Sequence, residues 1–176
     1  MLYNTLLICS INPTLYTNND VNVGFITQTK IKNMKFVQED YDKYDGVAKD
    51  LLADHLITKG YDILSTEEDF YHDVIAVKGG VKFYFEVEVK LGYPFNSARS
   101  FKFPTVSFTG RKLRLHKVEP FFYVIFCLST RSYLYCHSSV IYNEKYAENV
   151  NIYTKKRKGM DKMYRIPKEF CTFVTL

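Results

Sequence analysis

Residues 73–90 read DVIAVKGGVKFYFEVEVK and carry the clearest structural signal in the chain. An apolar run ends at Gly79-Gly80, a dipeptide typical of a tight hairpin turn, and the next run alternates apolar and polar residues. The pattern predicts two antiparallel strands, at 73–78 and 81–90. On the second strand, alternation places one set of polar side chains on a single face: Lys82, Tyr84, Glu86, Glu88 and Lys90.

Carboxylates gather at one end of this hairpin. When the pairing is centred on the turn, Asp73 lies opposite about residue 86, at the same end as Glu88. Carboxylates on one face, about 7 Å apart, can bracket a divalent ion with help from the neighbouring strand. Oxygen ligands without His or Cys favour Mg²⁺ or Mn²⁺, and a lysine beside the ion can orient an attacking water. Taken alone, E-x-E-x-K is more typical of a solvated ladder of ion pairs.

The sequence before the hairpin is helical. From Tyr41 to Lys59 apolar residues recur on one side at about 100° per residue, and Gly60 fits the position that follows a helix C-terminus. The buried side includes Val47, Ala48 and Leu52. A first strand is predicted at 61–64.

The sequence after the hairpin predicts further strands. An irregular stretch at 95–110 and a short helix or strand at 110–117 lead to FFYVIFCL at 121–128, which is typical of a central strand buried on both faces. A hairpin partner follows at 132–138, and MYRIPKEFCTFVTL at the C-terminus predicts two short extended pieces. The order of elements indicates a mixed α/β or α+β domain.

Composition limits the class of protein. With 176 residues, 47% hydrophobic and 24% charged, the chain is expected to form one domain at 34–176, preceded by an N-terminal extension or edge strand at 1–33. The four cysteines show no ligand spacing and are expected to be free and mostly buried. No segment reads as a signal peptide or a membrane span, so the sequence indicates an intracellular, soluble protein.

The net charge of +5 is unevenly spread. Residues 38–73 are acid-rich, whereas 99–117 and 155–168 are strongly basic, which suits either a metal site beside a polyanion or a solvated surface of mixed sign. No nucleotide-binding glycine motif and no Ser-His-Asp or Cys-His arrangement is present.

The whole string resembles the PD-(D/E)XK nuclease superfamily over about residues 41–128: an acid-bearing helix ending in Gly60-Tyr61, a strand, an Asp opening the next strand, a hairpin, and E-x-K at 88–90. The resemblance implies a restriction-endonuclease-like core with a central mixed β-sheet flanked by helices. It implies that Asp73 and Glu88 are metal ligands and that Lys90 is the catalytic lysine. His72 stands where the proline of the family's name would be.

The resemblance leaves two assignments open. Many members carry an acid on the first helix, and Asp45 is the preferred candidate because it lies at the edge of the buried side, whereas Asp50 and Asp54 are expected to face solvent. Glu86 is either an extra ligand or a partner of Lys82 or of a neighbouring strand.

Basic residues supply candidates for nucleic-acid binding. These are Arg111, Lys112, Arg114, Lys156 and Arg157. Phe101, Phe103 and Phe108 are interleaved with cations, an arrangement that fits either stacking on unpaired bases or a minor core covered by long side chains.

The expected function is a Mg²⁺-dependent endonuclease that hydrolyses phosphodiester bonds in DNA. The resemblance also allows a homodimer. One alternative is a catalytically inactive nucleic-acid-binding or interaction module of the same fold. Another is an unrelated α/β domain whose E-x-E-x-K is a surface ladder.

Overall fold

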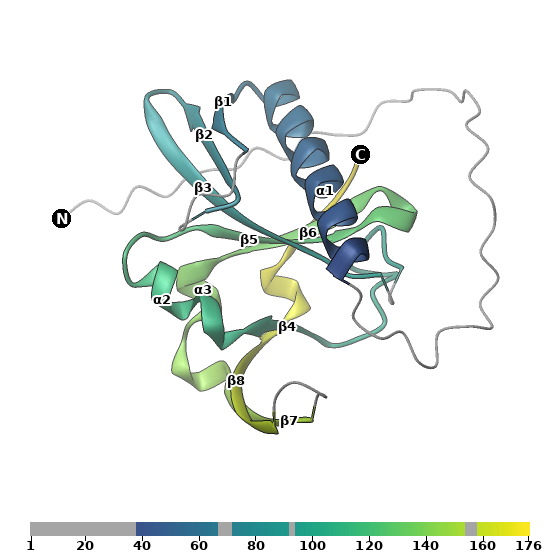
Figure 1. The fold of residues 1–176 in the computed structure, drawn as a ribbon, viewed down its shortest axis with the longest axis vertical. Coiled ribbons are helices and arrows are strands. Elements are labelled where there is room, and N and C mark those ends of the chain that lie inside the picture. Colours follow the sequence, from purple (N-terminus) through teal and green to yellow (C-terminus); the bar gives the residue numbers. More distant parts are fainter. Residues whose placement is uncertain (1–37, 67–71, 92–93, 154–157) are drawn as a thin grey trace. The chain divides into compact units, whose positions relative to one another are not determined.

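The computed structural model describes residues 38–66, 72–91, 94–153 and 158–176 (Figure 1). All of them belong to one compact unit, Lys35–Leu176. The segment predicted as an extension, 1–33, lies outside the described residues. Among the described residues, no helix is long and apolar enough to cross a membrane.

In the described part of the chain, helices are few and, apart from the first, short. The α-helices are α1 (Gln38–Thr58), α2 (Leu113–His116) and α3 (Ser138–Ile141). The 3₁₀ turns are η2 (Gly110–Lys112), η3 (Leu128–Thr130), η4 (Glu144–Tyr146) and η5 (Lys168–Phe170).

The strands form two sheets. The strands are β1 (Asp62–Ser65), β2 (Val74–Lys78), β3 (Val81–Val89), β4 (Thr105–Thr109), β5 (Phe122–Cys127), β6 (Ser132–His137), β7 (Ala147–Tyr153), β8 (Lys158–Pro167) and β9 (Thr172–Thr175). A six-stranded sheet has the order β1-β2-β3-β5-β6-β9, and a three-stranded sheet has the order β4-β8-β7. In the larger sheet, β3 and β5 are parallel and the other neighbours are antiparallel, so the fold is mixed α+β with a central mixed sheet.

The predicted hairpin is confirmed, with each strand one residue shorter at the open end than the predicted 73–78 and 81–90. Val74 pairs with Phe85 and Lys78 with Val81, and the turn between them is made by Gly79 and Gly80 at φ of 59° and 76°. Both glycines adopt the left-handed conformation that a two-residue hairpin turn with the right-handed twist of its strands requires. This register is what places Asp73 opposite Glu86.

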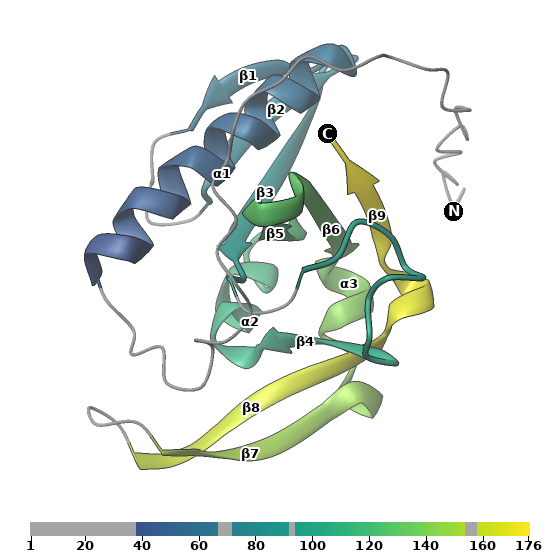
Figure 2. The ribbon, with the colours of Figure 1, turned by 90° about the vertical axis from the view of Figure 1, so that its right-hand side faces the viewer.

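Helix α1 covers one face of the larger sheet at β1, β2 and β3 (Figure 2). Ala48 and Leu52 are almost fully buried there, against Val74, Phe85 and Val124. Val47, which was expected on the buried side, is 47% exposed, because the helix packs through a narrower stripe than the periodicity indicated.

The other face of the larger sheet packs against the smaller sheet. This core includes Tyr123 and Ile125 from β5 and Tyr164 and Ile166 from β8. Phe108, one of the phenylalanines interleaved with cations, is fully buried in it. For Phe108, the minor-core interpretation is therefore correct.

The prediction of an irregular stretch at 95–110 was wrong for its second half. Residues 105–109 form β4, which pairs antiparallel with β8 from Thr105↔Pro167 to Thr109↔Met163. The pairing partner lies nearly sixty residues away, so a local pattern could not reveal it. The C-terminal extended pieces are confirmed as β8 and β9, although β8 begins earlier than expected.

Candidate active site

Asp73 and Glu86 are neighbours across the hairpin. The backbone N–H of Asp73 donates to the carbonyl of Phe85 at 3.1 Å, which ties Asp73 to β3 just beyond the last regular pair, Val74 and Phe85. The backbone N–H of Val87 donates to Asp73 Oδ2 at 2.8 Å. Both carboxyl side chains are buried, with Asp73 8% and Glu86 3% exposed as residues. Buried carboxylates require charge compensation, and lysines provide it here.

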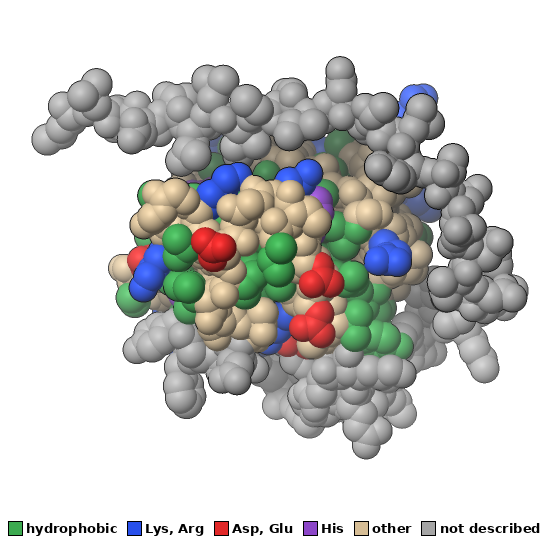
Figure 3. Space-filling view, turned by 90° about the horizontal axis from the view of Figure 1, so that it is seen from above, with side chains coloured by type: hydrophobic (Ala, Val, Ile, Leu, Met, Phe, Trp, Pro, Cys, Tyr) green, Lys and Arg blue, Asp and Glu red, His purple; other side chains and the backbone are tan. Residues whose placement is uncertain are grey.

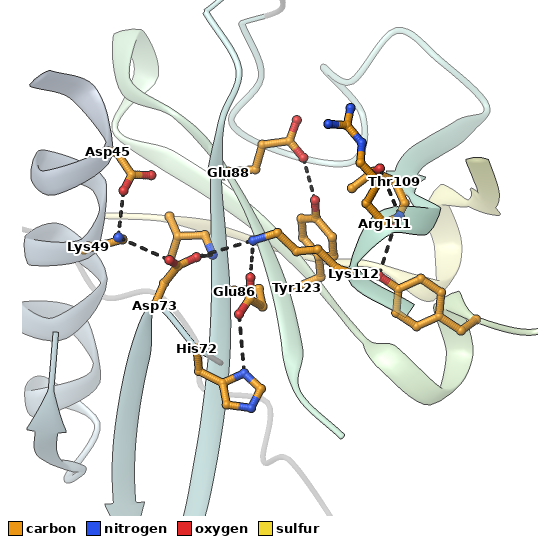
Figure 4. A network of polar contacts seen from close by, with 12 residues as sticks. Asp45, Lys49, His72, Asp73, Glu86, Glu88, Thr109, Arg111, Lys112 and Tyr123 are labelled. Atoms are coloured by element: carbon orange, nitrogen blue, oxygen red, sulfur yellow. Dashed lines mark hydrogen bonds and ion pairs between the residues drawn. The ribbon is translucent and has the colours of Figure 1, made fainter. Parts of the chain in front are cut away.

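Lys112 reaches these two carboxylates from the opposite side of the cluster to α1 (Figure 4). Its Nζ lies 3.6 Å from Asp73 Oδ2 and is hydrogen-bonded to Glu86 Oε2. Lys112 belongs to η2, which directly follows β4. At Gly110, the first residue of η2, an added Cβ would lie 2.5 Å from the backbone oxygen of Lys162 on β8. Close packing against β8 therefore fixes where η2 presents Lys112.

The helix contributes a second lysine. Lys49 Nζ lies 2.7 Å from Asp45 Oδ2 and 3.2 Å from Asp73 Oδ1. Burial lowers the pKa of Lys49, but hydrogen bonds to Asp45 and the negative charges of Asp73 and Asp45 more than offset this, so the pKa is raised. Asp45 thus joins the cluster through Lys49, whereas Asp50 and Asp54 are exposed, as expected.

Glu88 and Lys90 form a more accessible pair at the end of β3. Lys90 Nζ lies 2.7 Å from Glu88 Oε1, and the two side chains are 38% and 31% exposed. The carboxylate of Glu88 turns toward Tyr123, whose hydroxyl donates to Oε2 at 2.8 Å (Figure 4). Burial and the charge of Glu88 raise the pKa of Tyr123 well above its usual value. The phenol therefore stays protonated and can keep donating to Glu88.

Glu86 is part of the cluster, and among the described residues its ion-pair partners are His72 and Lys112, not Lys82. Besides Lys112, it faces His72, whose Nδ1 lies 3.4 Å from Glu86 Oε1. His72 is 5% exposed, and its ring lies 4.7 Å from that of Tyr84. His72, which stands where the resemblance would place a proline, therefore contacts Glu86, the candidate extra ligand.

The remaining basic candidates are separate from the carboxylates. Arg111 is exposed, with Nε 3.2 Å from Asp161 Oδ2 on β8, and Arg114 is exposed on α2. Lys156 and Arg157 lie outside the described residues. Among the described basic residues near the end of β4, Lys112 is the one that contacts the acidic cluster, and there its ammonium group binds carboxylates.

Two contributors had not been identified from the sequence. Lys49 follows Asp45 by four residues, the spacing of an ion pair on one helix face, and this signal could have identified it. Tyr123 could not be found in the same way. Its hydrogen bond to Glu88 depends on the parallel pairing of β3 with β5, in which Tyr123 lies opposite Glu86.

Within the described residues, no three His, Cys, Asp or Glu side chains are arranged to hold a metal ion. The arrangement instead has two parts. An interior cluster sets the carboxylates of Asp45, Asp73 and Glu86 against the ammonium groups of Lys49 and Lys112. A partly exposed pair, Glu88 and Lys90, adjoins it and is open to a water or a substrate.

The face seen from above in Figure 3 carries acidic, basic and hydrophobic side chains interspersed, without one continuous basic patch. No protein-family model, curated protein or solved structure matches the chain.

Proposed function

We propose that the chain is a metal-dependent nuclease of the restriction-endonuclease-like fold that hydrolyses phosphodiester bonds in DNA. One observation carries the proposal. Asp73 directly precedes Val74, the last β2 residue paired with β3, and its carboxylate shares Lys112 with that of Glu86, near the end of β3 that pairs in parallel with β5 and carries Glu88 and Lys90. An acid from the first helix reaches the same cluster through Lys49.

The chemical type of the donors suits a divalent cation. Its oxygens are hard carboxylate ligands of the type that Mg²⁺ and Mn²⁺ prefer. The ammonium group of Lys112 bridges Asp73 and Glu86, so positive charge is already accommodated between them. Asp73 and Glu88, with Glu86 as an additional donor, would hold the ion. Lys112 would have to leave these carboxylates for the ion to bind.

A bound ion would add positive charge beside the phosphate and lower the pKa of a coordinated water. Lys90 would orient the attacking water and offset charge on the phosphate. The Val87 N–H fixes one oxygen of Asp73 and leaves the orientation of this carboxylate defined before binding. Tyr123 does the same for Glu88.

The test is cleavage of plasmid, linear duplex and single-stranded DNA with Mg²⁺ or Mn²⁺. Glu88→Gln and Lys90→Ala should each lower the rate by about 10²- to 10⁴-fold, the range expected for losing one acid–base or orienting group. Lys82→Ala is the matched control, because Lys82 lies on the same face of β3 at its other end and is exposed. Cleavage that survives both site substitutions would contradict the site assignment.

Lys112→Met tests the competition between the lysine and the ion. Since a hydrogen bond to a charged group contributes about 1.5–3 kcal/mol, removing it should tighten Mg²⁺ binding roughly 10- to 150-fold in titration calorimetry. Arg111→Met is the matched control, since Arg111 is the neighbouring cation and pairs with Asp161 instead of the cluster. Equal Mg²⁺ affinities of the two variants would count against a metal ion at Asp73 and Glu86.

A second candidate function is a binding module of the same fold without cleavage. The observation that favours it is the pairing of Asp73 and Glu86 with lysines, which compensates the buried carboxylates without a metal ion. The same assays separate the two functions. DNA binding by the wild type, with no cleavage and no Mg²⁺ binding, would support the binding module.

A further inference from the structure

A cavity of about 390 Å³ adjoins the exposed half of the candidate site. Lys90 forms part of its wall, and Ile125, which is in register with Glu88 across β3 and β5, forms another part. The ammonium group of Lys90 contacts Glu88 at 2.7 Å. The cavity therefore begins at the pair to which the proposed function assigns metal binding and water orientation.

Aromatic rings make up much of the wall. Phe95 is 3% exposed, and Phe101 packs edge-on against it with ring centroids 5.6 Å apart. Phe103, 42% exposed, packs edge-on against Phe101 at 5.7 Å. The series leads from a fixed interior ring to a partly exposed one, so a flat ligand can lie against a supported aromatic surface.

The cavity also runs along the edge of a strand. Residues 103–107, five in succession, all line it. Because side chains in a strand alternate between faces, consecutive lining residues mean that the backbone itself borders the cavity. Within the described chain, β4 is an edge strand of the smaller sheet and pairs only with β8. Its outer edge can offer N–H and C=O groups to a ligand.

The charged groups in the wall are cationic. Among the described residues that line the cavity, Lys90 and Arg165 are basic and none is Asp or Glu. Arg165 also pairs through Nε with Glu148, which leaves other guanidinium N–H groups to donate. A ligand with a flat, hydrogen-bonding body and an attached negative charge suits this lining.

We infer that the cavity binds an unpaired nucleobase of the substrate strand, with the adjoining phosphate at Lys90. This inference rests on the proposed function and specifies its substrate. A base inside a duplex is stacked on both faces and cannot enter such a cavity, whereas an unpaired base can stack on aromatic side chains. The cavity volume lies within the range of about 300–1,000 Å³ found for small-ligand sites. The substrate is accordingly single-stranded DNA or DNA with an unpaired segment.

The test measures binding without cleavage. A short single-stranded DNA, the same strand in continuous duplex and the same strand with abasic sites are titrated with the protein in EDTA, with fluorescence anisotropy as the readout. The wild type should bind the single strand more tightly than the duplex or the abasic strand. Phe103→Ala should weaken single-strand binding about 5- to 150-fold, the effect of losing one stacked base, and leave duplex binding unchanged.

Two further variants separate stacking from folding. Phe103→Tyr retains the ring and should bind like the wild type. Phe170→Ala removes another exposed phenylalanine, 54% exposed and outside the cavity wall, and should also bind like the wild type. Thermal unfolding of each variant reports whether the fold is intact.

The outcomes distinguish this inference from the proposed function. Equal binding of single strand, abasic strand and duplex by the wild type, or unchanged single-strand binding by a folded Phe103→Ala, overturns the inference even if the protein cleaves DNA. Base-dependent, Phe103-dependent binding supports the inference even if no cleavage occurs with Mg²⁺, in which case it is the nuclease proposal that fails.

Discussion

The ammonium group of Lys49 lies between two carboxylates, those of Asp45 and Asp73. Its side chain is only 7% exposed. Removing one partner from a buried ion pair leaves an uncompensated charge in a medium of low polarizability, which is costlier than removing the whole pair. The two carboxylates would then also repel each other across the space that the lysine occupied.

Lys49→Met should therefore lower the free energy of unfolding by about 3–5 kcal/mol. Methionine retains an unbranched side chain of similar length, so the packing of the side chain at position 49 changes little. Urea denaturation measures the effect, and Lys82→Met, at an exposed position, is the control that should change little. A loss below about 1 kcal/mol would mean that the cluster tolerates its negative charge without Lys49.

For single residues, some side-chain roles follow from local spacing in the sequence and others do not. The position of Asp45 at the edge of the buried stripe follows from helical periodicity, and so does the exposure of Asp50. The role of Lys112 does not, since its contact with Glu86 joins residues 26 apart in the sequence. A cation beside a buried carboxylate and a cation facing a phosphate have the same sequence signature. Only the fold distinguishes them.

Among the elements, η2 is fixed by a close approach of two backbones. An added Cβ at Gly110 would lie 2.5 Å from the carbonyl oxygen of Lys162 and 3.2 Å from its carbonyl carbon. These are backbone atoms of a paired strand, so they cannot move aside as a flexible side chain could. Any residue larger than glycine must displace η2 from β8 and, with it, Lys112.

Gly110→Ala should destabilise the protein by about 1–3 kcal/mol, the usual cost of overpacking a well-packed contact. Gly46→Ala, on the exposed side of α1 where nothing lies within 4 Å, is the matched control. It should stabilise the protein by about 0.5–1 kcal/mol, because alanine favours the helix interior. Thermal or urea denaturation measures the stability of both variants. A Gly110→Ala protein as stable as the wild type would contradict the close packing of Gly110 against Lys162.

Elements defined by local chemistry were predictable, and elements defined by distant partners were not. The hairpin was assigned correctly because the Gly79-Gly80 turn and the strand alternation both lie within one short stretch. The end of α1 is also local: Gly60, at φ of 77°, donates to Ile57, and Tyr61 donates to Leu56. β4 lacked such a signal, since its five residues become a strand only through pairing with β8.

Over the whole molecule, tyrosines in the interior connect stability to pH. Burial, the first cause in each case, raises the pKa of Tyr123, Tyr133 and Tyr142 above the ordinary 10.0. The charge of Glu88 adds to the effect at Tyr123, and the charge of Glu86 does so at Tyr142. These side chains come from both cores, so their titration concerns the whole fold and not one site.

The sign of the pH dependence follows from the protons bound in each state. Above about pH 10 the unfolded chain releases the phenolic protons while the folded protein retains them, so the folded state binds more protons. The stabilisation that the protonated tyrosines contribute is complete below the pKa of tyrosine in the unfolded chain. It is lost as the pH rises toward the pKa values of these tyrosines in the folded protein. Lys49 contributes in the same direction, because its pKa is also raised.

The free energy of unfolding should therefore fall between about pH 10 and about pH 12, by up to about 1.4 kcal/mol per pH unit for each buried tyrosine. Urea denaturation at a series of pH values measures this slope. Tyr123→Phe should be less stable than the wild type near neutral pH, because it loses the hydrogen bond to Glu88, yet its stability should fall less steeply in alkali. A stability that stays level across this range, or an unchanged slope in Tyr123→Phe, would contradict the burial of these phenols.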